Sequence, residues 1–350
     1  MKAVFSAAQL AHAPRHFLNQ GKLVDYPEAP ERARLLLAGA KAAGAQVFAP
    51  RRFELEDYVY VHTKPYLEML ENGFAEFSQI PGAGPELLPS LRPLVRPTQV
   101  SSHILGRAGG FMMDFSCAIT KDTWRSAHAS AMTALTAADF VVKGDSVAYA
   151  LCRPPGHHAY AAAAGGFCYL NNTALAAQHL RSRFRKVAVL DIDVHHGNGT
   201  QAIFYRRADI LTISIHADPD QYYPYYWGYA SETGYAAGEG QNLNIPLPVR
   251  SDDRVWSEAL LKAIDKIKAF EPAALVVALG LDAHEDDPLA GGMVTTSGFE
   301  RMGSRIAGLN LPTVIVQEGG YLNEHLGDNL SMFLVGFQGG REQFVDAGAR

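Results

Sequence analysis

Short apolar runs rich in β-branched residues recur along the chain with helical stretches between them, and this alternation limits the possible folds more than any other feature. The runs lie at residues 146–150, 186–190, 210–214, 274–278 and 313–316. Continuous apolar strands of this kind are typical of a parallel sheet that is buried on both faces. Residues 172–181 and 257–270 have the apolar spacing of helices that cover such a sheet. The sequence therefore predicts an α/β fold.

One long segment, residues 72–97, departs from this alternation because glycine and proline interrupt any regular element. The residues responsible are Pro81, Gly82, Gly84, Pro85, Pro89, Pro93 and Pro97. Loops of this length are uncommon in compact domains and are usually functional, although a surface loop without a role is an equally open interpretation. Since the composition does not shift after residue 125, we predict a single domain over residues 1–350 with a loop insertion at 72–97.

The composition excludes several classes of protein. With 48% hydrophobic and 19% charged residues, the chain has the balance of an ordinary soluble globular protein. A net charge of -5 offers polyanions no general attraction, so nucleic acid is not an expected partner. No uncharged apolar stretch reaches the roughly 18 residues of a membrane helix, so no association with a membrane is expected.

The cysteines and the N-terminal residues bear on the cellular location of the protein. Cys117, Cys152 and Cys168 are too few and too scattered for a disulfide framework, which points to a reducing environment. Residues 1–6 read as a short strand and lack the apolar run and cleavage site of a signal peptide. We therefore expect a cytoplasmic protein.

Metal-binding side chains gather where the predicted strands end, which is where ligands bind in open parallel sheets. Asp191, Asp193 and His195 follow one strand at alternate positions, so that strand geometry places them on one side. Asp282 follows a second strand. Helix capping explains a single aspartate well, but not three ionisable groups at one apolar strand end. Oxygen and nitrogen ligands without thiolate, with one position left open, are typical of a catalytic zinc site.

Two further strand ends carry residues suited to catalysis. His157 and His158 follow two prolines and a glycine, and paired imidazoles can take up and deliver protons. Tyr321 follows a double glycine, and its hydroxyl can hydrogen-bond a developing oxyanion. A polar turn with exposed histidines and a tyrosine that anchors a loop are the alternative interpretations, and each is natural for its segment in isolation.

Taken in order, these segments resemble the signature of the histone deacetylase superfamily, in particular its bacterial branch of acetylpolyamine amidohydrolases and histone deacetylase-like amidohydrolases. The resemblance covers residues 153–159, 165–172, 191–200, 214–216, 279–289 and 318–321, with weaker similarity at 27–32. It implies an arginase/deacetylase-like three-layer fold, with a central, mainly parallel sheet of about eight strands flanked by helices.

The resemblance also assigns roles to individual residues. It implies that the zinc ligands are Asp193, His195 and Asp282, with iron(II) as the alternative ion. It implies a structural potassium ion held by Asp191, Asp193, His195, Ser214 and Ile215. The catalytic residues that it implies are the tandem His157 and His158, the carbonyl-polarising Tyr321, Asp191 as the support of His157 and Asn198 as the partner of His158.

The substrate channel is implied in the same way. Phe167 and Tyr223 match its aromatic walls, Gly166 matches the residue whose carbonyl binds the substrate amide, and Leu289 matches a position at the mouth. Tyr223 stands where phenylalanine is common, and its hydroxyl favours a polar or cationic substrate. Leu289 is apolar where polyamine-specific animal relatives carry an acid, and Ser116 stands where bacterial relatives place an acid near the polyamine. The 72–97 insertion resembles one that narrows the mouth and forms a homodimer.

From these residues we expect a zinc-dependent deacetylase that converts acetylpolyamines, or related small acetylated amines, to acetate and the free amine. Deacetylation of acetyl-lysine in proteins or peptides is the alternative within the same chemistry. A manganese ureohydrolase-like enzyme and a non-catalytic protein that binds acetylated amines are the remaining alternatives. The tandem histidines and the glycine-glycine-tyrosine motif belong to the deacetylase pattern, which argues against the ureohydrolase-like enzyme. A non-catalytic binding protein would not need a competent residue at every catalytic position.

Overall fold

A computed structural model describes residues 1–93 and 101–348, with side chains described as far as Arg341. Its centre is an eight-stranded sheet in which every neighbouring pair of strands is parallel. The order across the sheet is β4 (Gln46–Phe48), β1 (Lys2–Val4), β5 (Val147–Ala150), β12 (Thr313–Gln317), β10 (Ala274–Leu279), β6 (Val187–Asp191), β7 (Ile210–Ala217) and β8 (Asn242–Leu247). The predicted α/β fold with about eight strands is confirmed.

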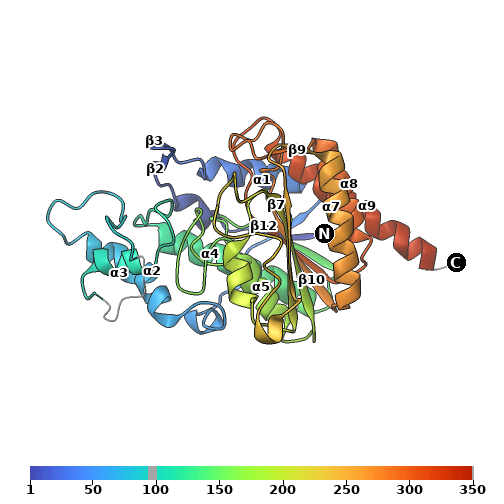
Figure 1. The fold of residues 1–350 in the computed structure, drawn as a ribbon, viewed down its shortest axis with the longest axis horizontal. Helices are drawn as coiled ribbons and strands as arrows, with labels where there is room; N and C mark the ends of the chain where they lie inside the picture. Colours follow the sequence, from blue (N-terminus) through green and yellow to red (C-terminus); the bar gives the residue numbers. More distant parts are fainter. Residues whose placement is uncertain (94–100, 349–350) are drawn as a thin grey trace.

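Helices cover the sheet on both faces, as Figure 1 shows. One layer contains α4 (Thr123–Val142) and α5 (Asn172–Leu180), and the other contains α1 (Pro30–Ala42), α7 (Asp253–Phe270), α8 (Thr296–Ala307) and α9 (Leu326–Gly348). Strand β6 shows how the sequence produces two cores, because Val187 and Val189 face the first layer whereas Ala188 and Leu190 face the second. The strands are apolar throughout because both of their faces are buried.

Smaller elements surround this centre. A two-stranded antiparallel hairpin, a second pair of short strands, two helices beside the insertion, a short helix at the active site and three short 3₁₀ helices complete the described elements. They are β2 (His16–Asn19) with β3 (Lys22–Asp25), β9 (Ser251–Asp252) with β11 (Gly292–Met293), α2 (Lys64–Phe77), α3 (Ile104–Gly110), α6 (Asn198–Phe204), η1 (Ala7–Ala11), η2 (Leu55–Asp57) and η3 (Ala236–Gly238).

The predicted insertion at 72–97 begins later than the sequence indicated. Residues 72–77 continue helix α2, which starts with Pro65 in its first turn and buries Gly73 and Phe77. Residues 78–93 follow without a helix and contain a single isolated bridge, from Leu87 to Ile119. Pro97 lies outside the described residues. The glycines and prolines therefore interrupt regular secondary structure only from Pro81 onward.

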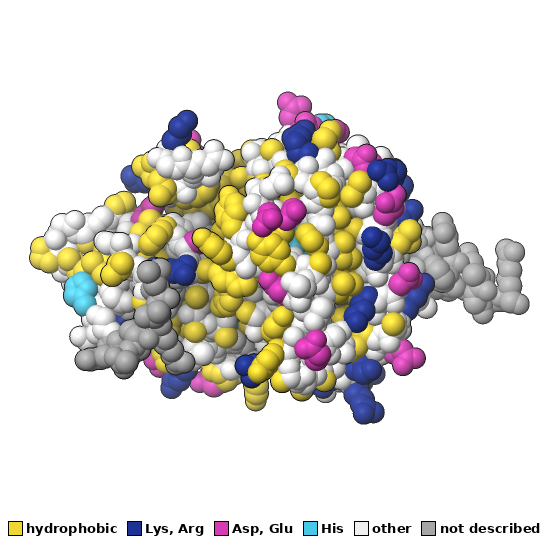
Figure 2. Space-filling model, in the orientation of Figure 1, with side chains coloured by type: hydrophobic (Ala, Val, Ile, Leu, Met, Phe, Trp, Pro, Cys, Tyr) yellow, Lys and Arg dark blue, Asp and Glu magenta, His cyan; other side chains and the backbone are white. Residues whose placement is uncertain are grey.

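The surface agrees with the charge balance of the sequence. On the face drawn in Figure 2, basic and acidic side chains are interspersed over the right half, and hydrophobic side chains are more frequent over the left half. Within the described part of the chain, no helix combines the length and the apolar character needed to cross a bilayer.

Candidate active site

The three side chains predicted to bind a metal meet at the carboxyl ends of β6 and β10. Nδ1 of His195 lies 3.0 Å from Oδ1 of Asp193 and 3.1 Å from Oδ2 of Asp282. One ligand atom from each residue lies within 4.8 Å of the other two, and all three side chains are buried. The sequence placed these residues at neighbouring strand ends, and the parallel sheet brings them together.

The route by which they converge differs from the one expected. Regular strand β6 ends at Asp191, so strand alternation does not orient Asp193 and His195. Instead each aspartate accepts a hydrogen bond from the backbone two residues later: Asp193 N donates to Asp191 Oδ1 at 3.0 Å, and His195 N donates to Asp193 Oδ1 at 2.9 Å. Such local turns are a common use of aspartate, and they bend the chain into the site.

The surroundings of this cluster fit a divalent cation. Burial disfavours a charged imidazole, yet Asp193 and Asp282 raise the pKa of His195 to about 9, which reflects the strong negative potential between the two carboxylates. Gly319 leaves the space that the carboxylates need, since a Cβ there would lie 2.0 Å from Oδ2 of Asp282. Two buried carboxylates and one imidazole form a donor set that suits zinc or iron(II).

The tandem histidines face this cluster and have opposite electrostatic environments. His157 Nδ1 lies 2.9 Å from Oδ2 of Asp191, and although burial opposes it, Asp191 and Asp193 raise the pKa of His157 well above its ordinary value. Burial lowers the pKa of His158 well below its ordinary value, and His157 and His195 add to this effect. Nδ1 of His158 lies 2.6 Å from Oδ1 of Asn198. The surroundings of the pair therefore favour the cationic form of His157 and the neutral form of His158.

Tyr321 is buried beside the cluster and is held by two groups to which the sequence analysis gave no role. Asp287 Oδ2 accepts a hydrogen bond from Tyr321 N at 2.8 Å, and its Oδ1 accepts one from Leu289 N at 2.9 Å. The guanidinium of Arg32 lies 4.8 Å from the centre of the Tyr321 ring. Arg32 is paired with buried Glu28 at 2.6 Å and donates to the carbonyls of Glu318 and Gly320. This charged group braces the turn that carries Tyr321.

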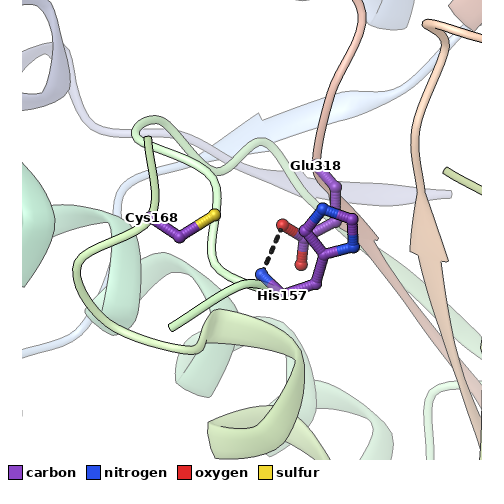
Figure 3. A group of neighbouring side chains, drawn as sticks. All are labelled: His157, Cys168 and Glu318. Carbon is purple, nitrogen blue, oxygen red and sulfur yellow. Dashed lines mark hydrogen bonds between the residues drawn. The ribbon is translucent and has the colours of Figure 1, made fainter. Parts of the chain in front are cut away.

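A second group of potential ligands lies beneath the histidines. Figure 3 shows His157, Cys168 and Glu318 close together, with the backbone of His157 donating to the Glu318 carboxylate. That carboxylate already accepts hydrogen bonds from Gly156 N at 2.6 Å, His157 N at 3.0 Å and Thr173 Oγ1 at 2.6 Å. Three of the roughly four lone pairs of this carboxylate are thus occupied, and Glu318 anchors the histidine loop.

The residues predicted to form the substrate channel lie in contact with His158 and Tyr321 or close to them. Phe167 packs against Tyr321 with a ring separation of 6.0 Å, and Leu289 packs against the same apolar group. The Tyr223 ring meets His158 edge to face at 5.0 Å. Gly166 has a φ of 54°, and a Cβ there would lie 2.2 Å from Cδ2 of His158, so only glycine fits this position. The Gly166 carbonyl accepts a weak hydrogen bond from Cys168 Sγ at 3.3 Å.

Asp114 is an acid that lies beside Gly166 and Tyr223, and the sequence analysis gave it no role. Asp114 Oδ2 accepts hydrogen bonds from the Tyr223 hydroxyl at 2.5 Å and from Gly166 N at 3.0 Å. Its Oδ1 accepts hydrogen bonds from Ser116 N and Oγ. All of these donors are neutral, and Asp114 has no lysine or arginine partner in the part of the chain that the structure describes. The one signal in the sequence was that Asp114 lies two residues before Ser116, where related proteins were expected to carry an acid.

The remaining predicted ligands lie on β7, the strand next to β6. Ser214 and Ile215 lie in β7, and Ser214 is paired in register with Asp191 of β6. Both are buried, and the Ser214 hydroxyl lies 2.8 Å from Nδ1 of His216. The five residues expected to hold potassium are thus contributed by adjacent strands and by the turn after β6.

Comparison with known proteins defines the class to which this fold and site belong. The family model of the histone deacetylase domain matches residues 26–336. The chain belongs to the histone deacetylase family.

Individual relatives within that family match nearly the whole chain. The acetylpolyamine amidohydrolase of Burkholderia pseudomallei is 45% identical over 96% of this chain and 98% of its own length. Acetylpolyamine amidohydrolase 1 of Pseudomonas aeruginosa is 41% identical over 97% of this chain and 99% of its own. The crystal structure of the Burkholderia pseudomallei acetylpolyamine aminohydrolase superposes with a TM-score of 0.94, covering 96% of this chain and 98% of that one.

Proposed function

We propose that this protein is a zinc-dependent deacetylase that hydrolyses acetylpolyamines, or related small acetylated amines, to acetate and the free amine. The observation that carries the proposal is the convergence of Asp193, His195 and Asp282 beneath an aromatic channel that also holds His158 and Tyr321. Full-length relatives named for acetylpolyamine hydrolysis support the choice of substrate class.

In the proposed reaction Asp193, His195 and Asp282 hold the metal ion. When bound, that ion supplies Lewis acidity, which polarises the acyl carbonyl and lowers the pKa of water. Neutral His158 takes the proton of the attacking water at Nε2 and returns it to the departing amine. His157, whose cationic form Asp191 favours, stabilises the negative charge that develops on the acyl oxygen. The Tyr321 hydroxyl donates a hydrogen bond to the same oxygen.

The negative charge of Asp114 supports a substrate that carries an ammonium group over an uncharged substrate. Asp114 is half-buried and its partners are all neutral, so its negative charge remains available to a cation at the channel. The Tyr223 hydroxyl orients this carboxylate, and the Tyr223 ring offers a face on which a cation can pack. An acetylated diamine presents an ammonium group a few bonds from its amide, and Asp114 is positioned to bind it in this proposal.

A comparison of substrates tests the proposal. The purified zinc-loaded protein should be assayed for kcat/KM with N-acetylputrescine, N-acetylcadaverine, acetylspermidine and a fluorogenic acetyl-lysine peptide. We expect the small acetylated amines to be better substrates than the peptide. A preference for the peptide would favour protein deacetylation instead, and no turnover of any substrate with full zinc loading would reject the enzymatic function.

Three further assignments complete the proposal. Potassium is proposed at Asp191, Asp193, His195, Ser214 and Ile215, where β6 and β7 pair in register.

A homodimer is proposed through residues 72–97, which include the 77% exposed Leu91. A cytoplasmic location is proposed because Cys117, Cys152 and Cys168 are all free thiols.

A further inference from the structure

The carboxamide of Asn198 lies behind His158 and is engaged at both of its ends. Its Oδ1 lies 2.6 Å from Nδ1 of His158. Its Nδ2 donates to the sulfur of Met113 at 3.0 Å and to the hydroxyl of Tyr160 at 3.2 Å. Asn198 is the first residue of α6 and is only 1% exposed, so these three contacts account for its amide.

The direction of this amide decides which nitrogen of His158 carries the proton. With Oδ1 facing it, Nδ1 of a neutral imidazole must bear the hydrogen, and Nε2 keeps a free lone pair. The reversed amide would present its NH₂ group to Nδ1. The hydrogen of His158 would then sit on Nε2, which could no longer accept a proton from water.

Met113 distinguishes the two orientations, whereas Tyr160 does not. A hydroxyl can donate or accept, so Tyr160 is compatible with either end of the amide. A thioether sulfur has no hydrogen to donate and can only accept. In the reversed orientation Oδ1 of Asn198 would face the lone pairs of Met113 without a hydrogen between them, so the buried amide would lose one of its hydrogen bonds.

The position of Met113 is itself restrained. Met113 N donates to the carbonyl of Ala164 at 2.6 Å, beside the bridge between Met112 and Ala164. A Cβ on Gly165 would lie 2.6 Å from Cε of Met113, so the glycine leaves the space that this side chain occupies. Met113 is 8% exposed and is held against the loop that follows the tandem histidines.

We propose that Met113 is a positioning residue for hydrolysis, because its sulfur holds the Asn198 amide in the orientation that keeps Nε2 of His158 free to accept a proton. Tyr160 occupies the second hydrogen of the same amide nitrogen. Neither side chain touches the substrate in this proposal. The inference rests on the proposed function, since it is His158 as the base of the reaction that gives the amide orientation its importance.

The first test compares two methionines that lie next to each other. Met113→Leu preserves volume and removes the acceptor, and Met112→Leu is the matched control, because Met112 is buried in the core at 3% exposure. For Met113→Leu we expect kcat for N-acetylputrescine to fall about three- to tenfold with KM unchanged, the range expected for loss of one weak hydrogen bond. Met112→Leu should stay close to the wild type. Equal effects of the two changes would overturn the proposal.

The second test makes the orientation irrelevant. In Asn198→Asp both side-chain oxygens accept, so reversal of the group changes nothing, and adding Met113→Leu should cause no further loss of kcat. A loss of the same size in both backgrounds would show that Met113 acts only through packing.

A third measurement does not depend on turnover. The ¹⁵N shifts of His158 report which ring nitrogen bears hydrogen, and Met113→Leu should increase the form with hydrogen on Nε2. An unchanged tautomer would overturn the proposal. A wild-type protein that turns over no acetylated amine would instead reject the proposed function, and it would leave the tautomer result standing.

Discussion

The floor of the site, formed by Asp193, His195, Asp282, His158 and Tyr321, differs sharply from its rim, formed by Asp114, Phe167, Tyr223 and Leu289. Every floor side chain is buried, and the backbone N–H groups of Val194 and Gly319 donate hydrogen bonds to Asp282 and Asp193. Asp114, Tyr223 and Leu289 of the rim are only half-buried, and they come from three separate loops.

This difference separates the chemistry from the choice of substrate. The floor is built from groups that would be costly to bury unless they were paired or bound to a metal, so it tolerates little change. The rim needs only to match the shape and charge of a substrate. Changes at the floor should therefore affect turnover with all substrates, whereas changes at the rim should affect some substrates and not others.

The largest effect is expected from the floor. Asp282→Asn removes one charge from the metal cluster and should lower both the zinc content and kcat, the latter by more than about 10³-fold, since a metal supplies several kcal/mol of charge stabilisation. Elemental analysis and steady-state kinetics measure the two effects. Full zinc loading with unchanged turnover would show that Asp282 is not a ligand.

Loss of the Tyr321 hydroxyl should be the next largest effect. Tyr321→Phe should reduce kcat by about 10²- to 10³-fold for every substrate, as expected for an oxyanion donor, without loss of zinc. Phenylalanine keeps the size and shape of the buried ring, so the fold should survive. Retention of full turnover in this variant would remove Tyr321 from the proposed reaction.

The third prediction concerns the folded structure that supports the floor, whose free energy of unfolding should decrease in acid. Burial lowers the pKa of His62 from 6.5 to about 4. Nε2 of His62 accepts a hydrogen bond from Asn171 N at 2.9 Å, and protonation of the ring would remove that acceptor. A depressed folded-state pKa gives stability that is complete above pH 6.5 and is lost as the pH falls toward 4, by up to about 3 kcal/mol. Thermal unfolding from pH 7 to 4 measures this loss.

The control for acid sensitivity is a pair of variants. His62→Gln should reduce the acid sensitivity, since an amide can supply a donor and an acceptor without titrating in this range. Buried His12 and His216, whose pKa values are also lowered, would cause the sensitivity that remains. The same change at His16, which is exposed on strand β2, should leave the profile unaltered. If both variants follow the wild-type curve, another group causes the acid sensitivity.

The smallest and most selective effect belongs to the rim. Asp114→Asn should raise KM for N-acetylputrescine roughly tenfold or more, in line with the strength of hydrogen bonds to charged groups, while kcat changes little. An uncharged acetylated alkylamine of the same length is the matched substrate, and its KM should not change. An equal rise in KM for both substrates would show that Asp114 does not select for the charged amine, and the proposed difference between the floor and the rim would be wrong.

Much of the floor could be predicted from the sequence because its residues follow strands. Buried parallel strands are recognisable as apolar runs, and their carboxyl ends share one edge of the sheet. The strand pattern alone therefore groups Asp193, His195, Asp282 and Tyr321 at that edge. The α/β fold and its strands were predictable for the same reason.

The tertiary structure alone decided the rest. Asp114 stands in a loop without periodicity, and only the folding of that loop against Gly166 and Tyr223 places its carboxylate at the channel. Met113 looks like any core methionine in sequence, yet packing brings its sulfur to Asn198. Strand patterns report local geometry, which is repeated along the chain, whereas contacts between loops depend on how distant segments pack, and no local pattern encodes that.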